Sequence, residues 1–248
     1  MLPESPPDAL KPLPDSLAGT DPQGLVAGEP VAQYQIGDYR NFVYLILDWA
    51  DRKAAIVDPQ EDLSEPLRAL EEHGFILERV LLTHTHFDHV AGVQELIETF
   101  PKLPLHLHSL DRHRLHKMGK GVWDACQLVE NGAQLRVGQL TVEALHTPGH
   151  SVGEICYFLR AQGNLSGARA YLFSGDTLFI RDCGRTDLET GSNEEMFRSL
   201  QTLKGLSPET IVLPGHHYVK ECASVMAREL ETSPPLRCRS VEELKALP

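Results

Sequence analysis

Short apolar runs alternate with polar turns along most of the chain. Asn41 to Asp48 and Ala54 to Val57 are almost wholly apolar, and a polar turn, Trp49 to Lys53, joins them. This pattern is typical of two buried strands in a hairpin. Leu63 to His73 instead carries apolar residues at helical spacing and stops before Gly74, a residue that commonly ends helices. The pattern therefore predicts both strands and helices.

The rest of the chain continues in the same way and predicts an α/β fold. The order is strands, helix, strand, helix and strands, followed by more strands, helix, strand and helix. Such an order favours two stacked sheets with helices outside and with ligands gathered along one edge, where strands end. Apolar patterning places strands at 76–82, 105–107, 134–137, 140–145, 155–159, 168–173 and 210–213, helices at 90–99, 193–203 and 218–230, and a turn at 163–167.

Two segments stand apart from this pattern. Residues 1–30 carry seven prolines and no aromatic residue, so they cannot bury enough apolar surface to offset their chain entropy. We expect an arm on the domain or a disordered tail there, and a single catalytic domain over 31–248. Residues 109–130 are polar and rich in His, Lys and Arg. A solvated irregular loop is the favoured interpretation, and part of a substrate rim is the alternative.

Charge and cysteine content narrow the function. The formal net charge is -12, from 23 basic and 35 acidic residues, and no basic stripe is present, which argues against nucleic acid or an anionic membrane as a partner. The five cysteines form no C-x-x-C pair, so reduced thiols are expected. Cys183 is expected to pack, with a functional thiol as the alternative. No signal core or membrane-spanning run is seen, so a cytoplasmic location is expected.

The candidate chemistry begins directly after the apolar run 80–82. Three histidines and an aspartate follow it within six residues: His84, His86, Asp88 and His89. Imidazole and carboxylate groups are ligands that Zn²⁺ and Fe²⁺ prefer. His84 and His86 are two apart at a strand end, so they point the same way and can chelate one ion. Asp88 and His89 can face a neighbouring ion. The loop is therefore interpreted as a metal site.

Three later residues also follow an apolar strand within a Gly- or Pro-marked turn. They are His150 in T-P-G-H, Asp176 in S-G-D and His216 in L-P-G-H. An aspartate after glycine is by itself most often a turn residue. Together with the histidine-rich loop, however, the three residues indicate a shared metal site. His217 is the adjacent candidate for the last position, and His146 is interpreted as structural.

The ordered motifs T-H-x-H-x-D-H, T-P-G-H, G-D and P-G-H resemble the metallo-β-lactamase superfamily over about residues 33–218. The resemblance implies an αββα four-layer sandwich. It also implies His84, His86 and His150 on one metal, Asp88, His89 and His216 on a second, and Asp176 between them. Two divalent ions, Zn²⁺ or Fe²⁺ with Mn²⁺ as a further choice, would hold a hydroxide that attacks a carbonyl. Asp88 and Asp176 would be the catalytic carboxylates.

Two branches of the superfamily fit the sequence best. Glyoxalase II enzymes, which hydrolyse S-lactoylglutathione to lactate and glutathione, are similar in the segments 153–158, 175–179 and 214–218. In that family the residues matching Arg185 and Tyr218 contact glutathione. A small-molecule glutathione conjugate is therefore the expected partner.

Persulfide dioxygenases are the alternative, because they are similar in Cys183-Gly-Arg-Thr-Asp187. They bind one Fe²⁺ through the residues matching His84, His150 and Asp176, as a facial triad would. Phe87 and Thr177 fit the hydrolase pattern better. A third hypothesis is a member of the fold that binds without catalysis; the seven intact ligand positions argue against it.

Overall fold

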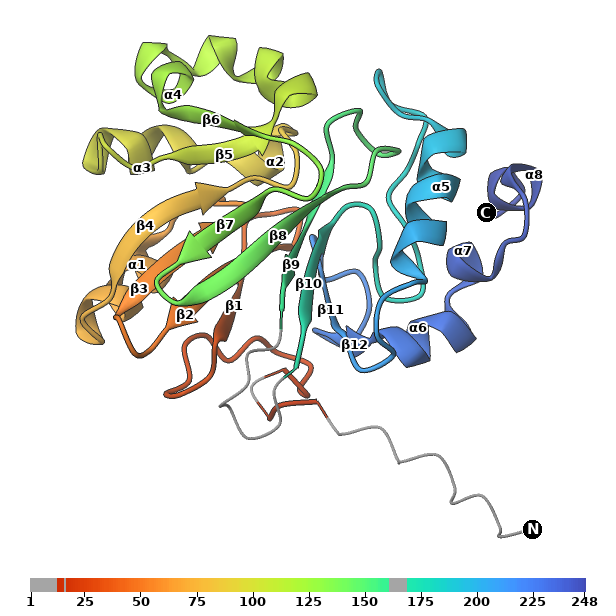
Figure 1. Ribbon diagram of the computed structural model, residues 1–248, viewed down its shortest axis with the longest axis horizontal. Coiled ribbons are helices and arrows are strands. Elements are labelled where there is room, and N and C mark those ends of the chain that lie inside the picture. Colours follow the sequence, from red (N-terminus) through yellow and green to blue (C-terminus); the bar gives the residue numbers. More distant parts are fainter. Residues whose placement is uncertain (1–12, 16, 161–168) are drawn as a thin grey trace, which may run out of the picture.

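The computed structural model describes residues 13–15, 17–160 and 169–248, and within them two six-stranded sheets lie face to face (Figure 1). The first sheet has the order β1 (Val31–Ile36), β2 (Asn41–Asp48), β3 (Lys53–Val57), β4 (Ile76–Leu81), β5 (Leu105–His108) and β6 (Cys126–Val129). The second has the order β12 (Ser224–Val225), β11 (Ile211–Pro214), β10 (Tyr171–Gly175), β9 (Ile155–Leu159), β8 (Leu140–His146) and β7 (Gln134–Val137).

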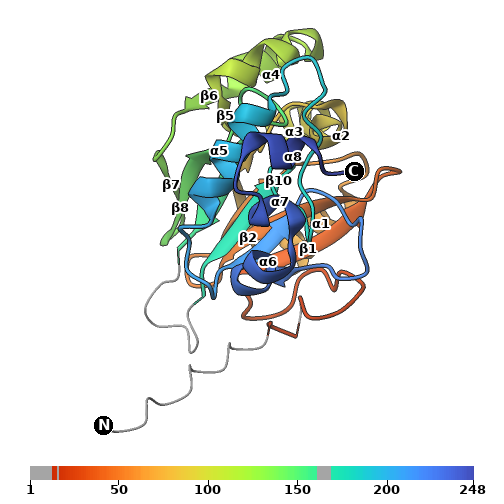
Figure 2. The same ribbon diagram turned by 90° about the vertical axis from the view of Figure 1, so that its right-hand side faces the viewer.

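Helices cover the outer face of each sheet (Figure 1). The first sheet carries α1 (Ser64–Glu72), α2 (Phe87–Val90), α3 (Val93–Thr99), the 3₁₀ helix η1 (Ser109–Met118) and α4 (Lys120–Ala125). The second carries α5 (Asn193–Leu203), α6 (Met226–Thr232), α7 (Pro234–Arg237) and α8 (Val241–Lys245), which Figure 2 shows from the front. The result is the αββα sandwich that the motifs predicted, and that prediction is confirmed.

Strand β2 shows why the pattern leads to this layering. All eight of its residues are buried. Phe42, Tyr44 and Ile46 pack into the core between the sheets. The alternate residues Val43, Leu45 and Leu47 pack under the helices instead. Because successive side chains point to opposite faces of a strand, a fully apolar run satisfies a sheet that is covered on both sides.

The prediction of an irregular loop at 109–130 is wrong. The segment forms η1, α4 and β6, and β6 pairs in parallel with β5. Two apolar residues, Leu115 and Val122, anchor it in the core of the first sheet. The Arg112 guanidinium also lies 3.8 Å from the centroid of the Trp123 ring. Such widely spaced anchors leave little periodic signal in a polar sequence.

Two predicted helices are shorter than expected. The helix at 90–99 is split into α2 and α3 near Gly92, where a Cβ atom would lie 2.3 Å from the Gln60 carbonyl oxygen. The helix at 218–230 begins only at Met226, because Ser224 and Val225 pair with β11 as an edge strand. The predicted strand 168–173 is found as β10, and the turn at 163–167 lies outside the described residues.

Part of the proline-rich N-terminal segment packs against the sandwich. Leu17 is buried in the core between the sheets, and Gly24 forms a bridge with Gln33 of β1. The Trp49 indole also donates a hydrogen bond to the Glu29 carbonyl, at 2.6 Å. The division of the chain at residue 30 stays a prediction. Within the described ranges, no helix combines the length and apolar character needed to cross a membrane.

Candidate metal centre

The seven predicted ligands meet at one edge of the sandwich, where strands of both sheets end. His84 and His86 follow β4, and Asp88 and His89 lie in α2. The other three come from the second sheet: His150 from the loop between β8 and β9, Asp176 after β10 and His216 after β11. Backbone hydrogen bonds tie the two sheets together here, from Phe42 to the Gly215 carbonyl at 2.8 Å and from Ile155 to the Thr83 carbonyl at 2.8 Å.

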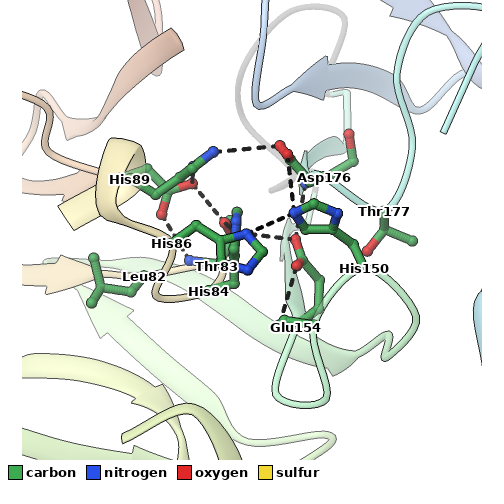
Figure 3. Close-up of polar contacts among 12 residues, drawn as sticks. Leu82, Thr83, His84, His86, His89, His150, Glu154, Asp176 and Thr177 are labelled. Atoms are coloured by element: carbon green, nitrogen blue, oxygen red, sulfur yellow. Dashed lines mark hydrogen bonds and ion pairs between the residues drawn. The ribbon is translucent and has the colours of Figure 1, made fainter. Parts of the chain in front are cut away.

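The ligand atoms form two adjoining clusters, one of His84, His86 and His150 and one of Asp88, His89 and His216. His86 Nδ1 lies 2.8 Å from His150 Nε2, a contact that Figure 3 shows as a dashed line. His89 Nε2 lies 3.2 Å from His216 Nε2 in the second cluster. Within each cluster the ligand atoms lie within 4.8 Å of one another, which is the spacing of groups arranged around an ion.

Asp176 contacts histidines of both clusters, and Figure 3 shows its carboxylate joined to His89 and to His150. Its Oδ2 is 3.4 Å from His150 Nε2 in the first cluster and 3.4 Å from His216 Nε2 in the second. Its Oδ1 is 3.5 Å from His89 Nε2. One carboxylate therefore faces both clusters, as the resemblance implied for a bridging ligand.

The imidazoles are oriented from behind by acceptors on their other ring nitrogens. His150 Nδ1 lies 2.8 Å from the Arg185 carbonyl oxygen, and His216 Nδ1 lies 2.9 Å from the Tyr39 carbonyl oxygen. A carbonyl only accepts, so Nδ1 carries the proton and Nε2 keeps its lone pair toward the cluster. His89 Nδ1 lies 3.0 Å from Asp58 Oδ2 in the same way. Metal-binding histidines are typically held like this.

Charge at the site favours a cation. Burial and the neighbouring imidazoles lower the pKa of His84 well below its ordinary value, and burial with the charges of His150 and Arg114 lowers the pKa of His86 to about 4. Both rings are then neutral at pH 7, the form that binds metal. Burial alone would lower the pKa of His89, but three carboxylates, Asp176 foremost, outweigh it and raise that pKa to about 10. The surrounding carboxylates thus favour positive charge at this position.

Two buried ligand atoms support the fit of divalent ions to these residues. His84 Nε2 and Asp176 Oδ1 have no hydrogen-bond partner within the part of the chain that the structure describes. Buried polar atoms without a partner are costly and rare in proteins. Both atoms belong to the cluster of His84, His89 and Asp176, so an ion there would satisfy them. The donor set of imidazoles and carboxylates suits Zn²⁺, Fe²⁺ and Mn²⁺ alike.

Sequence reasoning missed two buried carboxylates that support the ligands. Asp58 accepts hydrogen bonds from the Thr83 backbone at 2.8 Å and the Thr83 hydroxyl at 2.6 Å, besides its contact with His89. Glu154 Oε1 accepts from the Asp176 backbone at 2.9 Å and lies 3.5 Å from His84 Nδ1 (Figure 3). Asp58 ends an apolar strand as the ligands do, which could have identified it. Glu154 precedes its strand and gave no such signal.

The predicted substrate residues line a cavity of about 580 Å³ that opens onto the centre. The Arg185 guanidinium pairs with Asp187 through two hydrogen bonds of 2.6 and 2.7 Å and is largely exposed. The Tyr218 ring stacks on His216, with centroids 4.7 Å apart. Arg114 of η1 also lines the cavity, so the segment 109–130 does contribute to its rim.

The other candidates lie outside the clusters. His217 Nδ1 lies 2.6 Å from Gln35 Oε1, and its ring packs on Phe42. His146 stacks on His108, with centroids 4.0 Å apart. Cys183 lines the cavity, and burial raises the pKa of its thiol to about 12, so the thiolate form is disfavoured.

Gly184→Ala is expected to damage the centre through the backbone. A Cβ atom at residue 184 would lie 2.0 Å from the Asp176 carbonyl oxygen and 3.1 Å from His150 Cγ. We expect at least a tenfold loss of metal affinity, the effect of disturbed support of ligands, measured by competition with a chromogenic chelator. Gly121→Ala is the matched control, because its Cβ would meet only Ile97 at 3.7 Å. Unchanged affinity in the Gly184 variant would contradict this account.

Comparisons with known proteins agree with this geometry. A family model described as the metallo-beta-lactamase superfamily matches residues 36–216. The chain is 40% identical over 181 residues to a hydroxyacylglutathione hydrolase of Synechococcus, a match that covers 72% of this chain and 65% of that protein. It is 37% identical over 180 residues to the cytoplasmic hydroxyacylglutathione hydrolase of Arabidopsis thaliana, with 72% and 64% covered. Each match thus spans slightly less than two thirds of the relative.

Matches to two solved structures cover more of the length of the similar protein. The crystal structure of ETHE1 from Myxococcus xanthus matches with a TM-score of 0.71 at 29% identity, over 88% of this chain and 92% of that one. The crystal structure of TTHA1623 in a di-iron-bound form matches with a TM-score of 0.64 at 30% identity, over 82% and 98%. An uncharacterized protein of Mycobacterium leprae is 34% identical over 210 residues, with 77% and 91% covered.

Proposed function

Because the chain belongs to the metallo-β-lactamase superfamily, whose members bind divalent metals, we propose that it is a metal-dependent hydrolase of glutathione thioesters, acting on S-lactoylglutathione or a close analogue. The observation that carries the proposal is the pair of adjoining ligand clusters with Asp176 between them, at the floor of a cavity that Arg185 also lines. The names of the Synechococcus and Arabidopsis relatives support the same substrate class.

The chain's own residues would hold two ions at adjoining positions. His84, His86 and His150 would hold one ion, Asp88, His89 and His216 the other, and Asp176 both. When bound, such ions bring the pKa of a coordinated water to about 7 and stabilise developing negative charge on a carbonyl oxygen. Asp88 Oδ2 lies 3.5 Å from His216 Nε2 and accepts a 3.1 Å hydrogen bond from the Asn41 amide, so Asp88 is held where it can orient the attacking water.

Hydrolysis also needs a leaving group that can depart. Water adds its oxygen to the acyl carbon, the carbon–sulfur bond breaks, and the sulfur leaves as thiolate, with the released proton going to solvent. A thiol has a free pKa of about 8.5, so this departure needs no strong general acid. Glu154 is buried behind the ligands and bonded to the Asp176 backbone, so it supports the site rather than reaching the substrate.

The glutathione part would lie against Arg185. Its guanidinium is exposed at the cavity and held by Asp187, and it can bind a substrate carboxylate in a forked geometry. The Tyr218 hydroxyl would donate a hydrogen bond to the glutathione part of the same substrate. We also propose the cytoplasm as the location, in agreement with the cytoplasmic Arabidopsis relative.

Arg185→Ala is expected to raise the KM for S-D-lactoylglutathione severalfold, to at most about tenfold, because the guanidinium would lose charge-assisted hydrogen bonds to a substrate carboxylate and its exposure weakens them. The kcat is expected to change less than KM. Steady-state kinetics check this, with Arg68→Ala as the control, since Arg68 is similarly exposed but pairs with Glu72 on α1. An unchanged KM would exclude glutathione binding through this side chain.

The direct test of the proposal is hydrolysis of S-D-lactoylglutathione by purified, metal-loaded protein. We expect turnover of about 1 to 1000 per second, the ordinary enzymatic range. Its absence would favour the persulfide dioxygenase alternative, which the likeness to the ETHE1 structure keeps open. That alternative requires one iron at His84, His150 and Asp176 and predicts oxygen uptake with glutathione persulfide.

A further inference from the structure

Two large aromatic side chains stand in solvent at the mouth of the cavity. Tyr39 is 52% exposed and Phe87 is 66% exposed, and both line the cavity that holds the ligands. Their rings contact each other edge to face, with centroids 5.2 Å apart. Apolar side chains grouped on a surface usually mark a binding surface. The Tyr39–Phe87 pair is therefore a candidate binding surface for part of the substrate.

The backbone of each aromatic residue is joined directly to predicted ligands. Phe87 lies between the ligands His86 and Asp88 at the start of α2. The carbonyl of Tyr39 accepts the hydrogen bond from His216 Nδ1 at 2.9 Å. Tyr39 is thus attached to the second cluster, and Phe87, whose ring contacts Tyr39, lies where the two clusters meet.

The cationic part of the cavity is attached to the other cluster. The carbonyl of Arg185 accepts from His150 Nδ1 at 2.8 Å. Arg114 lines the same cavity as Arg185 and His150. Arg185 is therefore joined to the first cluster, whereas Tyr39, whose ring contacts Phe87, is joined to the second. A substrate whose reacting carbonyl lies between the clusters has one end on each side.

We propose that the Tyr39–Phe87 pair binds the acyl group and that the preferred substrates are glutathione thioesters with an aromatic acyl group. This inference rests on the proposed function, which places glutathione on Arg185 and Tyr218 and leaves the part of the cavity lined by Tyr39 and Phe87 to the acyl group. A methyl group covers little of two exposed rings, whereas a phenyl group buries much more apolar area and makes ring–ring contacts. The cavity of about 580 Å³ is within the usual range for ligands of this size.

The first test compares two thioesters that differ only in the acyl substituent, S-D-mandeloylglutathione with a phenyl group and S-D-lactoylglutathione with a methyl group. We expect the metal-loaded protein to show a kcat/KM about tenfold higher for the mandeloyl substrate, the size of a favourable aromatic contact. Phe87→Ala and Tyr39→Ala are each expected to reduce this ratio severalfold. Tyr39→Ala keeps the backbone carbonyl that His216 uses.

The matched control is Phe100→Ala. Phe100 is also an exposed phenylalanine, at 39%, but it lies at the end of α3 and does not line this cavity. The mandeloyl-to-lactoyl ratio is expected to stay at the wild-type value in this variant. A ratio at or below one in the wild type, or an unchanged ratio in both aromatic variants, would overturn the inference while leaving the thioesterase proposal in place.

A second test needs no turnover. Calorimetric titration with S-benzylglutathione and S-ethylglutathione compares a phenyl with a methyl group on thioethers that cannot be hydrolysed. We expect the benzyl compound to bind about tenfold more tightly, and this advantage to be lost in the Phe87 and Tyr39 variants. Equal binding would overturn the aromatic site. If the benzyl advantage is found but neither thioester is hydrolysed, the proposed reaction fails and the aromatic site stands.

Discussion

Asp176→Asn is expected to reduce thioester hydrolysis by roughly a thousandfold, the size of removing a dominant electrostatic contribution from a hydrolytic site. The substitution keeps the shape but removes the negative charge that faces both clusters. Asp176 Oδ2 lies 3.4 Å from a histidine of each cluster, so we expect both positions to lose affinity for metal together. The measurements are kcat for S-D-lactoylglutathione and the metal content per chain.

Asp182→Asn is the matched control for that variant. Asp182 lines the same cavity, but its Oδ1 accepts a 2.8 Å hydrogen bond from the Cys183 backbone, an acceptor role that asparagine can keep. We expect its rate to stay within about threefold of wild type, because the change keeps this hydrogen bond and Asp182 belongs to neither ligand cluster. An Asp176→Asn variant that kept more than a tenth of the wild-type rate would contradict the bridging role proposed for Asp176.

His216→Ala is expected to reduce hydrolysis about a hundredfold while leaving the first ion position occupied. His216 lies 3.2 Å from His89 and 3.5 Å from Asp88, and it belongs to the second cluster. One metal per chain is therefore expected to remain after gel filtration. The dioxygenase alternative predicts that His216→Ala leaves the metal content unchanged at one iron per chain, because that iron would not use His216.

The neighbouring His217 provides the control for this variant. Its ring faces Gln35 and Phe42, so His217→Ala is expected to keep two metals and most of the activity even if stability falls. Loss of the second metal from the His217 variant instead of the His216 variant would mean that the ligand is misassigned by one residue.

The positions of the seven predicted ligands could be predicted because each lies in a loop or turn that follows an apolar strand. His84, Asp176 and His216 sit directly after β4, β10 and β11, and strand ends of a layered α/β fold gather at one edge. Strand β2 was predictable for a related reason, since a wholly apolar run suits a sheet that is covered on both faces.

The features that were missed depend on contacts between distant residues. The segment 109–130 folds because Leu115 and Val122 find places in the core under the first sheet, and β6 needs β5 as its partner. Glu154 matters because the fold brings it under His84 and Asp176. No local pattern encodes such pairings, and tertiary packing decides them.

The measurement that tests the two-metal thioesterase most directly is a titration of the metal-free protein with Zn²⁺, with hydrolysis of S-D-lactoylglutathione followed at each addition. Asp176 contacts a histidine of each cluster, so we predict that the rate stays below about a tenth of its maximum until one ion per chain is bound. It should then rise to the maximum as the second ion binds. A full rate at one ion per chain, or no hydrolysis with both positions filled, would contradict the account.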